Sequence, residues 1–133
     1  MAGTAIVRVS LETDGLGSGS KNLSCRYAET VAPEEVFYGY QVIGTTVANL
    51  DLGGIAVTKI RGVMMRAIGG TIGVLVNDVG TGTPVATAGN IVIPANGCAY
   101  IPIGGGLTTA YTIRVVGSAA ASAIEYLVYG QET

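Results

Sequence analysis

The fold is decided by the stretch Gly54-Ile-Ala-Val-Thr-Lys-Ile-Arg-Gly-Val-Met-Met-Arg-Ala-Ile-Gly-Gly-Thr-Ile-Gly-Val-Leu-Val-Asn77. Its first part alternates with period two, so one parity holds Ile60, Gly62 and Met64 and the other holds Lys59, Arg61 and Val63. This pattern is typical of a strand with one face turned inward. After Gly69-Gly70 the alternation resumes with Ile72, Val74 and Val76. The stretch therefore predicts two strands joined by a tight glycine turn into a hairpin, against which other strands stack.

Further strands are predicted wherever apolar residues alternate between glycine-, proline- or asparagine-rich turns. Their predicted ranges are 4–13, 22–31, 36–43, 47–54, 85–88, 91–93, 98–103, 107–116 and 122–129, with 47–54 either a short strand or a crossing connection. A tight turn is predicted at 94–97, Pro-Ala-Asn-Gly. Residues 117–122 are rich in alanine, but they lack a long apolar periodicity, and we predict a loop.

The strand pattern also indicates the fold class. No amphipathic stretch of helical period occurs, and about eight to ten strands follow one another at intervals of roughly 8–12 residues. No linker or internal repeat is visible. The sequence therefore predicts an all-β chain that folds as one antiparallel β-sandwich or jelly roll over residues 1–133.

The composition indicates that much of the surface is covered by other subunits. Charged residues make up 12% of the 133 residues, against about 25% in an average soluble domain, while 49% are apolar and 21 are glycine. A chain this poor in charge has little with which to cover a free monomer. Disorder is disfavoured, because disordered chains are rich in charge and poor in apolar residues.

The charges also exclude classes of partner. The net charge is −2 and the seven cations are scattered, whereas nucleic-acid binding needs a concentrated basic stripe. Lys59, Arg61 and Arg66 come nearest to a basic patch. They either bind a polyanion or are solubilising charges on one strand.

The sequence also bears on secretion and membrane insertion. The amino terminus lacks the pattern of a secretory signal, and the uncharged run 79–113 contains too much Gly, Pro, Thr and Asn for a bilayer helix. We expect no direct nucleic-acid partner and no membrane partner.

The residue types argue against catalysis. The chain has no histidine, which removes the usual base of a nucleophilic triad and the commonest metal ligand. Paired carboxylates are conceivable at Glu34 with Glu35 or at Asp51 with Asp78, but the tryptophan that commonly lines a glycosidase cleft is absent. Asn77 and Asp78 offer oxygens for calcium without the alternating acidic pattern of a calcium loop. We therefore predict a protein that is not an enzyme, with no catalytic, cofactor-binding or metal-binding residues and no cofactor.

The two cysteines, Cys25 and Cys98, do not have the spacing of metal ligands. Two interpretations are open. They form one disulfide if the fold brings them together, or they are two small apolar residues of strands.

The tyrosines are the candidate binding residues. Tyr38 and Tyr40 stand two positions apart and so share one face of a strand, where they either stack on sugars or bases or pack at a neighbouring strand or subunit. The set considered for binding of a sugar or a host receptor is Tyr38, Tyr40, Tyr100, Tyr111, Tyr126 and Tyr129. Exposed tyrosines clustered at one loop end would favour such binding, and tyrosines sealed in subunit contacts would favour assembly.

Several segments together resemble small virion proteins of tailed bacteriophages. They are Leu50-Asp-Leu-Gly-Gly-Ile-Ala56, 57–68, Gly73-Val-Leu-Val-Asn77, 107–116 and Ile124-Glu-Tyr-Leu-Val-Tyr129. In such proteins an apolar segment of the type Leu-Asp-Leu-Gly leads into a strand, and a glycine-rich β-sandwich follows. The resemblance covers roughly residues 36–130, and the most similar class is that of capsid decoration, or cement, proteins.

The resemblance implies a location and partners. Decoration proteins commonly sit as trimers on the outer capsid surface, where they bridge neighbouring major capsid subunits. The expectation is a homo-oligomer, most simply a trimer, which is made in the bacterial cytoplasm and binds the major capsid protein on the virion. A tail, neck or head-fibre component is the alternative structural role, and a glycan- or receptor-binding module is the alternative class.

Residues 1–35 are the candidate for an arm that reaches a neighbouring subunit, with the glycine-serine segment 14–20 as its hinge. Deleting residues 1–20 is then expected to weaken capsid binding while the sandwich stays folded.

Overall fold

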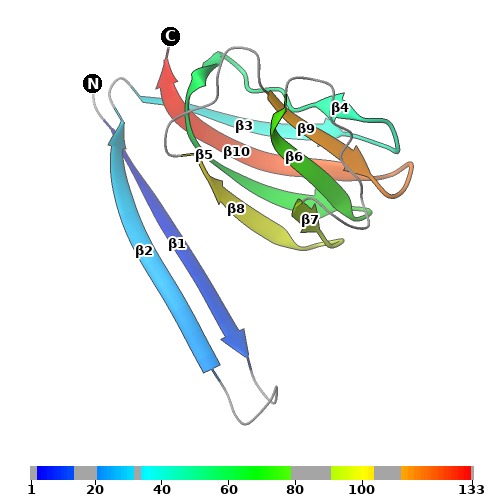
Figure 1. The fold of residues 1–133 in the computed structure, drawn as a ribbon, viewed down its shortest axis with the longest axis horizontal. Coiled ribbons are helices and arrows are strands. Elements are labelled where there is room, and N and C mark those ends of the chain that lie inside the picture. Colours follow the sequence, from blue (N-terminus) through cyan, green and yellow to red (C-terminus); the bar gives the residue numbers. More distant parts are fainter. Residues whose placement is uncertain (1–2, 14–20, 32–33, 79–90, 104–111, 133) are drawn as a thin grey trace. The chain divides into compact units, whose positions relative to one another are not determined.

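The computed structural model describes residues 3–13, 21–31, 34–78, 91–103 and 112–132. These residues form strands and turns and include no helix, which confirms the all-β class (Figure 1). The chain divides into two compact units, Met1–Pro33 and Glu34–Thr133. Each unit is described below by itself.

The first unit is a two-stranded antiparallel hairpin of β1 (Gly3–Thr13) and β2 (Lys21–Val31). The register runs without interruption from the pair Gly3 and Val31 to the pair Thr13 and Lys21. Both strands agree with the predicted ranges to within a residue. Segment 14–20, the predicted hinge of the arm, lies outside the described residues. The boundary between the two units follows Pro33.

The second unit contains two four-stranded antiparallel sheets, with strand orders β3-β10-β5-β8 and β4-β9-β6-β7 (Figure 1). The strands are β3 (Glu34–Val42), β4 (Ala48–Asn49), β5 (Ile55–Ile68), β6 (Ile72–Asp78), β7 (Ile91–Ile93), β8 (Cys98–Pro102), β9 (Thr112–Gly117) and β10 (Ala123–Glu132). The pairings are nested: β6 pairs with β7, β5 with β8, β4 with β9 and β3 with β10. Pairing of β5 with β10 and of β6 with β9 completes the two sheets.

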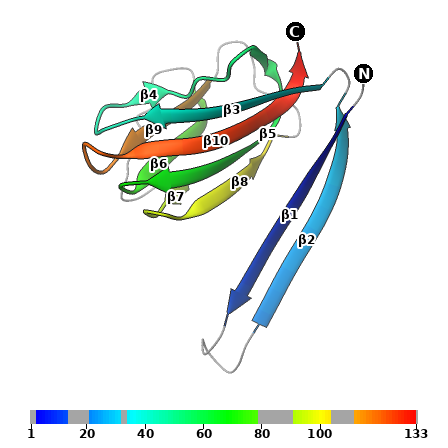
Figure 2. The ribbon, with the colours of Figure 1, turned by 180° about the vertical axis from the view of Figure 1, so that it is seen from behind.

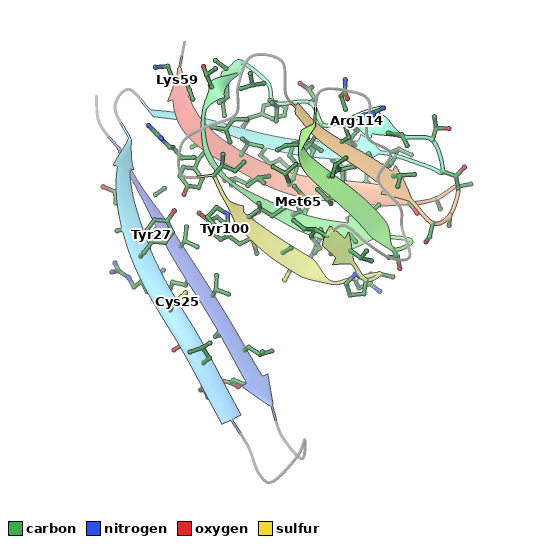
Figure 3. All side chains as sticks on the ribbon, viewed as in Figure 1. Cys25, Tyr27, Lys59, Met65, Tyr100 and Arg114 are labelled. Atoms are coloured by element: carbon green, nitrogen blue, oxygen red, sulfur yellow. The ribbon has the colours of Figure 1, made fainter. Side chains whose placement is uncertain are left out.

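The two sheets pack face to face around one apolar core. β5 and β10 supply side chains to it from one sheet, and β6 and β9 supply them from the other. The largest apolar side chains that are fully buried are Ile60, Val63, Met65, Ile72, Val74, Ile93, Ile113, Val115, Ile124 and Val128. Figure 3 labels Met65, which lies between the sheets. Each such burial contributes about 1.5–3 kcal/mol, so this core is the main source of stability.

The predicted hairpin of β5 and β6 is wrong. The two strands lie in different sheets, and β5 pairs with β8 and β10 while β6 pairs with β7 and β9. The chain crosses between the sheets at Gly69, whose φ is +72°, and a Cβ there would lie 2.6 Å from the carbonyl oxygen of Ala121. Both strands bury an apolar face in the same core from opposite sides, and a shared sheet is not needed for that.

The side chains of β5 do not follow the single alternation predicted from the sequence, in which Ile60, Gly62 and Met64 share one face. Ile60 pairs with Gly130 while Gly62 pairs with Tyr129, so β5 carries one extra residue at this point. Such a bulge exchanges the two faces of a strand. As a result Ile60, Val63 and Met65 are all buried, while Met64 is 44% exposed on the other face.

The remaining predictions concern short elements. The turn 94–97 is confirmed, with Asn96 at φ 62° and the Gly97 amide donating to the Pro94 carbonyl at 2.8 Å. However, β7 and β8 on either side of it lie in different sheets. The loop at 117–122 is confirmed and is closed by the Ser122 amide, which donates to the Ala119 carbonyl at 3.0 Å. The predicted strand 85–88 lies outside the described residues.

Candidate interaction surface

The β3-β10-β5-β8 sheet has one face on the core and a second face that we call the outer face (Figure 2). The register aligns its side chains in rows across the strands. One row is Tyr38, Leu127, Met64 and Tyr100, and the next is Tyr40, Glu125, Arg66 and Cys98. Val36 and Val42 flank these rows on β3. Large apolar or aromatic side chains therefore cover most of the outer face.

These side chains are not covered by the second unit itself. Tyr38 and Tyr40 are 60% and 58% exposed, and Val36, Val42, Met64 and Leu127 are also exposed. A contiguous exposed apolar patch of this kind marks an interaction surface, whereas scattered single apolar residues do not. The patch extends over β3, which is an edge strand of its sheet. An edge strand also presents unpaired backbone N–H and C=O groups to which another chain can bind.

The centre of the outer face carries a small polar network without net charge. Arg66 Nη2 lies 2.9 Å from Glu125 Oε1, and the Tyr38 hydroxyl donates to Glu125 Oε2. The hydrogen bond to Glu125 raises the pKa of Tyr38. These groups line a shallow depression of about 360 Å³ together with Met64, Cys98 and Leu127. Because the two charges neutralise each other, a partner that covers this face need not supply a counter-charge.

At the other end of the outer face, two tyrosines lie over Gly62. The Tyr100 and Tyr129 hydroxyls are 2.9 Å apart, and a Cβ on Gly62 would lie 2.7 Å from both tyrosine side chains. Tyr129 is therefore buried although it belongs to the outer face. Figure 3 labels Tyr100 on β8.

Tyr126 points to the opposite side of the sheet, into the core. Its hydroxyl donates to the Asp51 carbonyl at 2.6 Å, and its ring packs against Phe37 with the centroids 6.0 Å apart. Burial, followed by the charge of Asp51, raises the pKa of Tyr126 to about 12. The predicted tyrosine set is therefore divided: Tyr38 and Tyr40 are exposed together, Tyr126 is structural, and Tyr111 lies outside the described residues.

A second apolar surface lies on the β1–β2 hairpin. The cross-strand pairs put Val7 with Tyr27, Val9 with Cys25 and Leu11 with Leu23 on one side, and we call these six residues the hairpin face. The other side carries Arg8 opposite Arg26 and Ser10 opposite Ser24. Leu11 and Leu23 are 65% and 76% exposed, and Figure 3 shows Cys25 and Tyr27 on β2. The first unit has no second layer of its own to cover this face.

The candidate sites for other chemistry are not assembled by the described residues. Asp51 Oδ1 accepts a hydrogen bond from the Gly53 amide at 3.0 Å, which is a turn-capping role. The side chains of Glu34, Glu35 and Asp78 lie outside the description. Among the described residues, no group of three or more His, Cys, Asp or Glu side chains is placed to hold a metal ion.

In the predicted cation patch, Arg66 forms an ion pair with Glu125, which neutralises its charge. Lys59 is exposed and Arg61 is half-buried. Cys25 and Cys98 are both free and exposed in the structure, one in each unit.

Sequence reasoning missed Met64, Arg66, Glu125 and Leu127 as members of one surface. The missed signal lies in β5, where the buried residues Ile60, Val63, Met65 and Ala67 change spacing from three to two. A bulge leaves this signature in the burial pattern. The sequence does not show it, because Val63, Met64 and Met65 are all apolar.

Comparison with protein-family models, with curated proteins and with solved structures finds no match to this chain. In the part of the chain that the structure describes, no helix is long and apolar enough to cross a membrane.

Proposed function

We propose that this protein is a non-enzymatic structural protein of a bacteriophage virion, which self-assembles and binds the major capsid protein as a decoration protein. The observation that carries the proposal is the presence of exposed apolar strand faces on both units, the outer face and the hairpin face. Exposed apolar faces of this kind are suited to contacts with other proteins, which supports a role in assembly. The phage assignment comes from the sequence resemblance.

The strand order supports the finer proposal that the second unit is a jelly roll. A jelly roll arises when a long antiparallel hairpin of four strand pairs is rolled up so that its strands fall into two sheets. The nested pairings β6–β7, β5–β8, β4–β9 and β3–β10 have this form. Jelly rolls occur in viral capsid proteins and also in lectins, so this topology fits both the proposed virion role and a glycan-binding function.

The physical basis of the proposed role is burial of uncharged β surface. At about 25 cal/mol per Å² of apolar area, an interface of ordinary size supplies enough free energy to hold a small protein on a lattice. Closure into a ring, most simply a trimer, would also cover the exposed edge strands.

The decisive experiment is to measure the solution mass by light scattering and then the co-sedimentation with capsids that lack the protein. The proposal predicts a mass of three times the 13.4 kDa chain and pelleting with capsids. A lysozyme-like monomer of similar size serves as the control for trapping. A stable monomer that stays in the supernatant contradicts the proposal. An oligomer that ignores capsids but binds tail or neck preparations indicates the tail, neck or head-fibre role.

A glycan- or receptor-binding function is the second candidate, because Tyr38 and Tyr40 are exposed side by side on an edge strand. Tyrosine rings in this arrangement can stack on sugars. Screening on a glycan array, with Tyr40→Ala as the variant, tests it. Binding that the variant loses supports this function, and the absence of any bound glycan removes it.

A further inference from the structure

We propose that the hairpin face of one copy packs on the outer face of a second copy. This rests on the self-assembly part of the proposed function and adds the two surfaces that meet. The contact is head-to-tail: each copy donates its β1–β2 hairpin and receives a hairpin on its β3-β10-β5-β8 sheet.

The hairpin needs a cover. A two-stranded sheet is marginally stable in water at best, and a third strand or a packed layer is normally required. The hairpin face nevertheless exposes five of its six side chains, with Leu11 and Leu23 the most exposed and Val7 half-buried. An uninterrupted register of this length is consistent with a surface that is held by a partner.

The outer face resembles the hairpin in length and the hairpin face in chemistry. The hairpin strands have 11 residues each, or about 36 Å at roughly 3.3 Å per residue. β3 and β10 have 9 and 10 residues, or about 30 Å. The described side chains of the hairpin face are uncharged, and the central charges of the outer face, Arg66 and Glu125, are paired with each other. Contact between these six residues and the centre of the outer face therefore buries no unpaired charge. The register places Glu29 opposite Ala5 and Lys21 opposite Thr13, beyond the two ends of the hairpin face.

The area of one contact lies at the lower end of the range for stable interfaces. Six side chains of this size bury roughly 400–700 Å² on the hairpin side and a similar area on the outer face, or roughly 800–1,400 Å² in total, against about 1,600 ± 400 Å² for a standard interface. In a closed head-to-tail ring each copy makes two such contacts, and both stabilise the ring. A heterologous contact of this kind forms a ring when its rotation closes, which agrees with a trimer.

The occupant to which the proposal commits is the hairpin of a second copy. A hairpin that covers the sheet of its own chain is one of the outcomes that the experiment below distinguishes.

Charge substitutions on the two sides of the full-length hairpin test the contact. Leu11→Asp with Leu23→Asp puts two charges on the hairpin face, and Ser10→Asp with Ser24→Asp puts the same charges on the opposite side of the same strands. All four positions are exposed, so the second unit stays folded in both proteins. We expect the leucine variant to raise the dissociation constant of the oligomer by at least about 100-fold and the serine variant to change it little. Equal effects of the two variants overturn the proposal.

The two free cysteines identify the partner surface. Cys25 lies on the hairpin face and Cys98 on the outer face beside Arg66, so a short bis-maleimide reagent can link them between copies. We expect linked oligomers from the wild type and none from Cys25→Ser or Cys98→Ser alone. A mixture of the two single variants is expected to give linked dimers, because each supplies the cysteine that the other lacks.

Each other outcome contradicts the proposal in a distinguishable way. Linked dimers from Cys98→Ser alone indicate contact between two hairpins, and internally linked monomers from the wild type indicate that the hairpin covers its own sheet. An oligomer that gives no Cys25–Cys98 link overturns this contact while self-assembly stands. A monomer in light scattering overturns self-assembly as well.

Discussion

Gly39 shows how single residues shape the sheet that carries the outer face. On the core side of β3, the Tyr126 ring lies across Gly39, and a Cβ there would come within 2.4 Å of the ring. The ring is held in place by the hydrogen bond from its hydroxyl to the Asp51 carbonyl. Glycine at this position therefore allows a large aromatic side chain to lie flat between the sheets.

Replacing Gly39 by alanine is expected to lower the free energy of unfolding by about 1–3 kcal/mol, the usual cost of overpacking a core. Chemical denaturation monitored by circular dichroism measures this change. Gly54→Ala is the matched control, because a Cβ at Gly54 meets nothing within 4 Å. Equal stability of the two variants would show that Tyr126 moves aside without cost.

Tyr126 makes the free energy of unfolding depend on pH in the alkaline range. Its pKa is raised from 10.0 to about 12, so the folded state keeps the proton that the unfolded chain loses near pH 10. The stabilisation is fully present below pH 10 and is lost as the pH rises toward about 12. We expect the melting temperature to fall over this range, and to fall less steeply in Tyr126→Phe. Tyr40→Phe, at an exposed position, serves as the control and should follow the wild type.

At the scale of elements, the hairpin and the two packed sheets differ in how they are stabilised. Among the described residues, all those of the buried core belong to the second unit. The hairpin contributes none of them and pairs only with itself among the described strands. The second unit is therefore expected to fold without the first.

Deletion of residues 1–33 is expected to leave the melting temperature of the second unit within a few degrees of the intact chain under conditions where both are monomeric. Calorimetry measures it. The same deletion is expected to abolish self-association. It is a cleaner test than deletion of residues 1–20, which would remove β1 and leave β2 without its partner. Loss of folding in the deletion variant would contradict the independence of the core.

At the scale of the whole molecule, the proposed assembly is held by apolar contacts. Salt is therefore not expected to dissociate the oligomer. The outer face carries a neutral pair at its centre, and the described hairpin face has no charge. Salt screens charge pairs but does not weaken burial of apolar area.

We expect the dissociation constant of the oligomer to stay constant or to decrease when salt is raised from about 0.1 M to about 1 M. Sedimentation velocity over this range measures it. Dissociation at high salt would show that charges hold the copies together and would contradict an apolar contact.

Much of the local structure could be predicted from the sequence. β1, β2, β3, β7 and β10 lie where the alternation of apolar residues indicates strands, and the Pro94–Gly97 turn follows from its residue types. The alternation along β10 also has a counterpart in the structure, where Ile124, Tyr126 and Val128 lie in the core. These features depend on neighbours in the chain, so the pattern contains them.

The partner of each strand could not be predicted in the same way. The Gly69-Gly70 turn is compatible with a hairpin and with a crossing between sheets, and the choice depends on β8, β9 and β10, which follow later in the chain. The bulge near Arg61 likewise depends on the register with β10, and it decides that Met64 faces outward.

By itself, the sequence determined the all-β class, the positions of most strands, the shortage of charge and the lack of histidine. Only the tertiary structure decided that the amino-terminal strands form a separate hairpin, and that tyrosines, a paired Arg66 and Glu125, and a free cysteine share one face. The physical reason is range: alternation and turn chemistry act between neighbouring residues, whereas a surface is assembled by hydrogen bonds between strands that lie far apart in the chain.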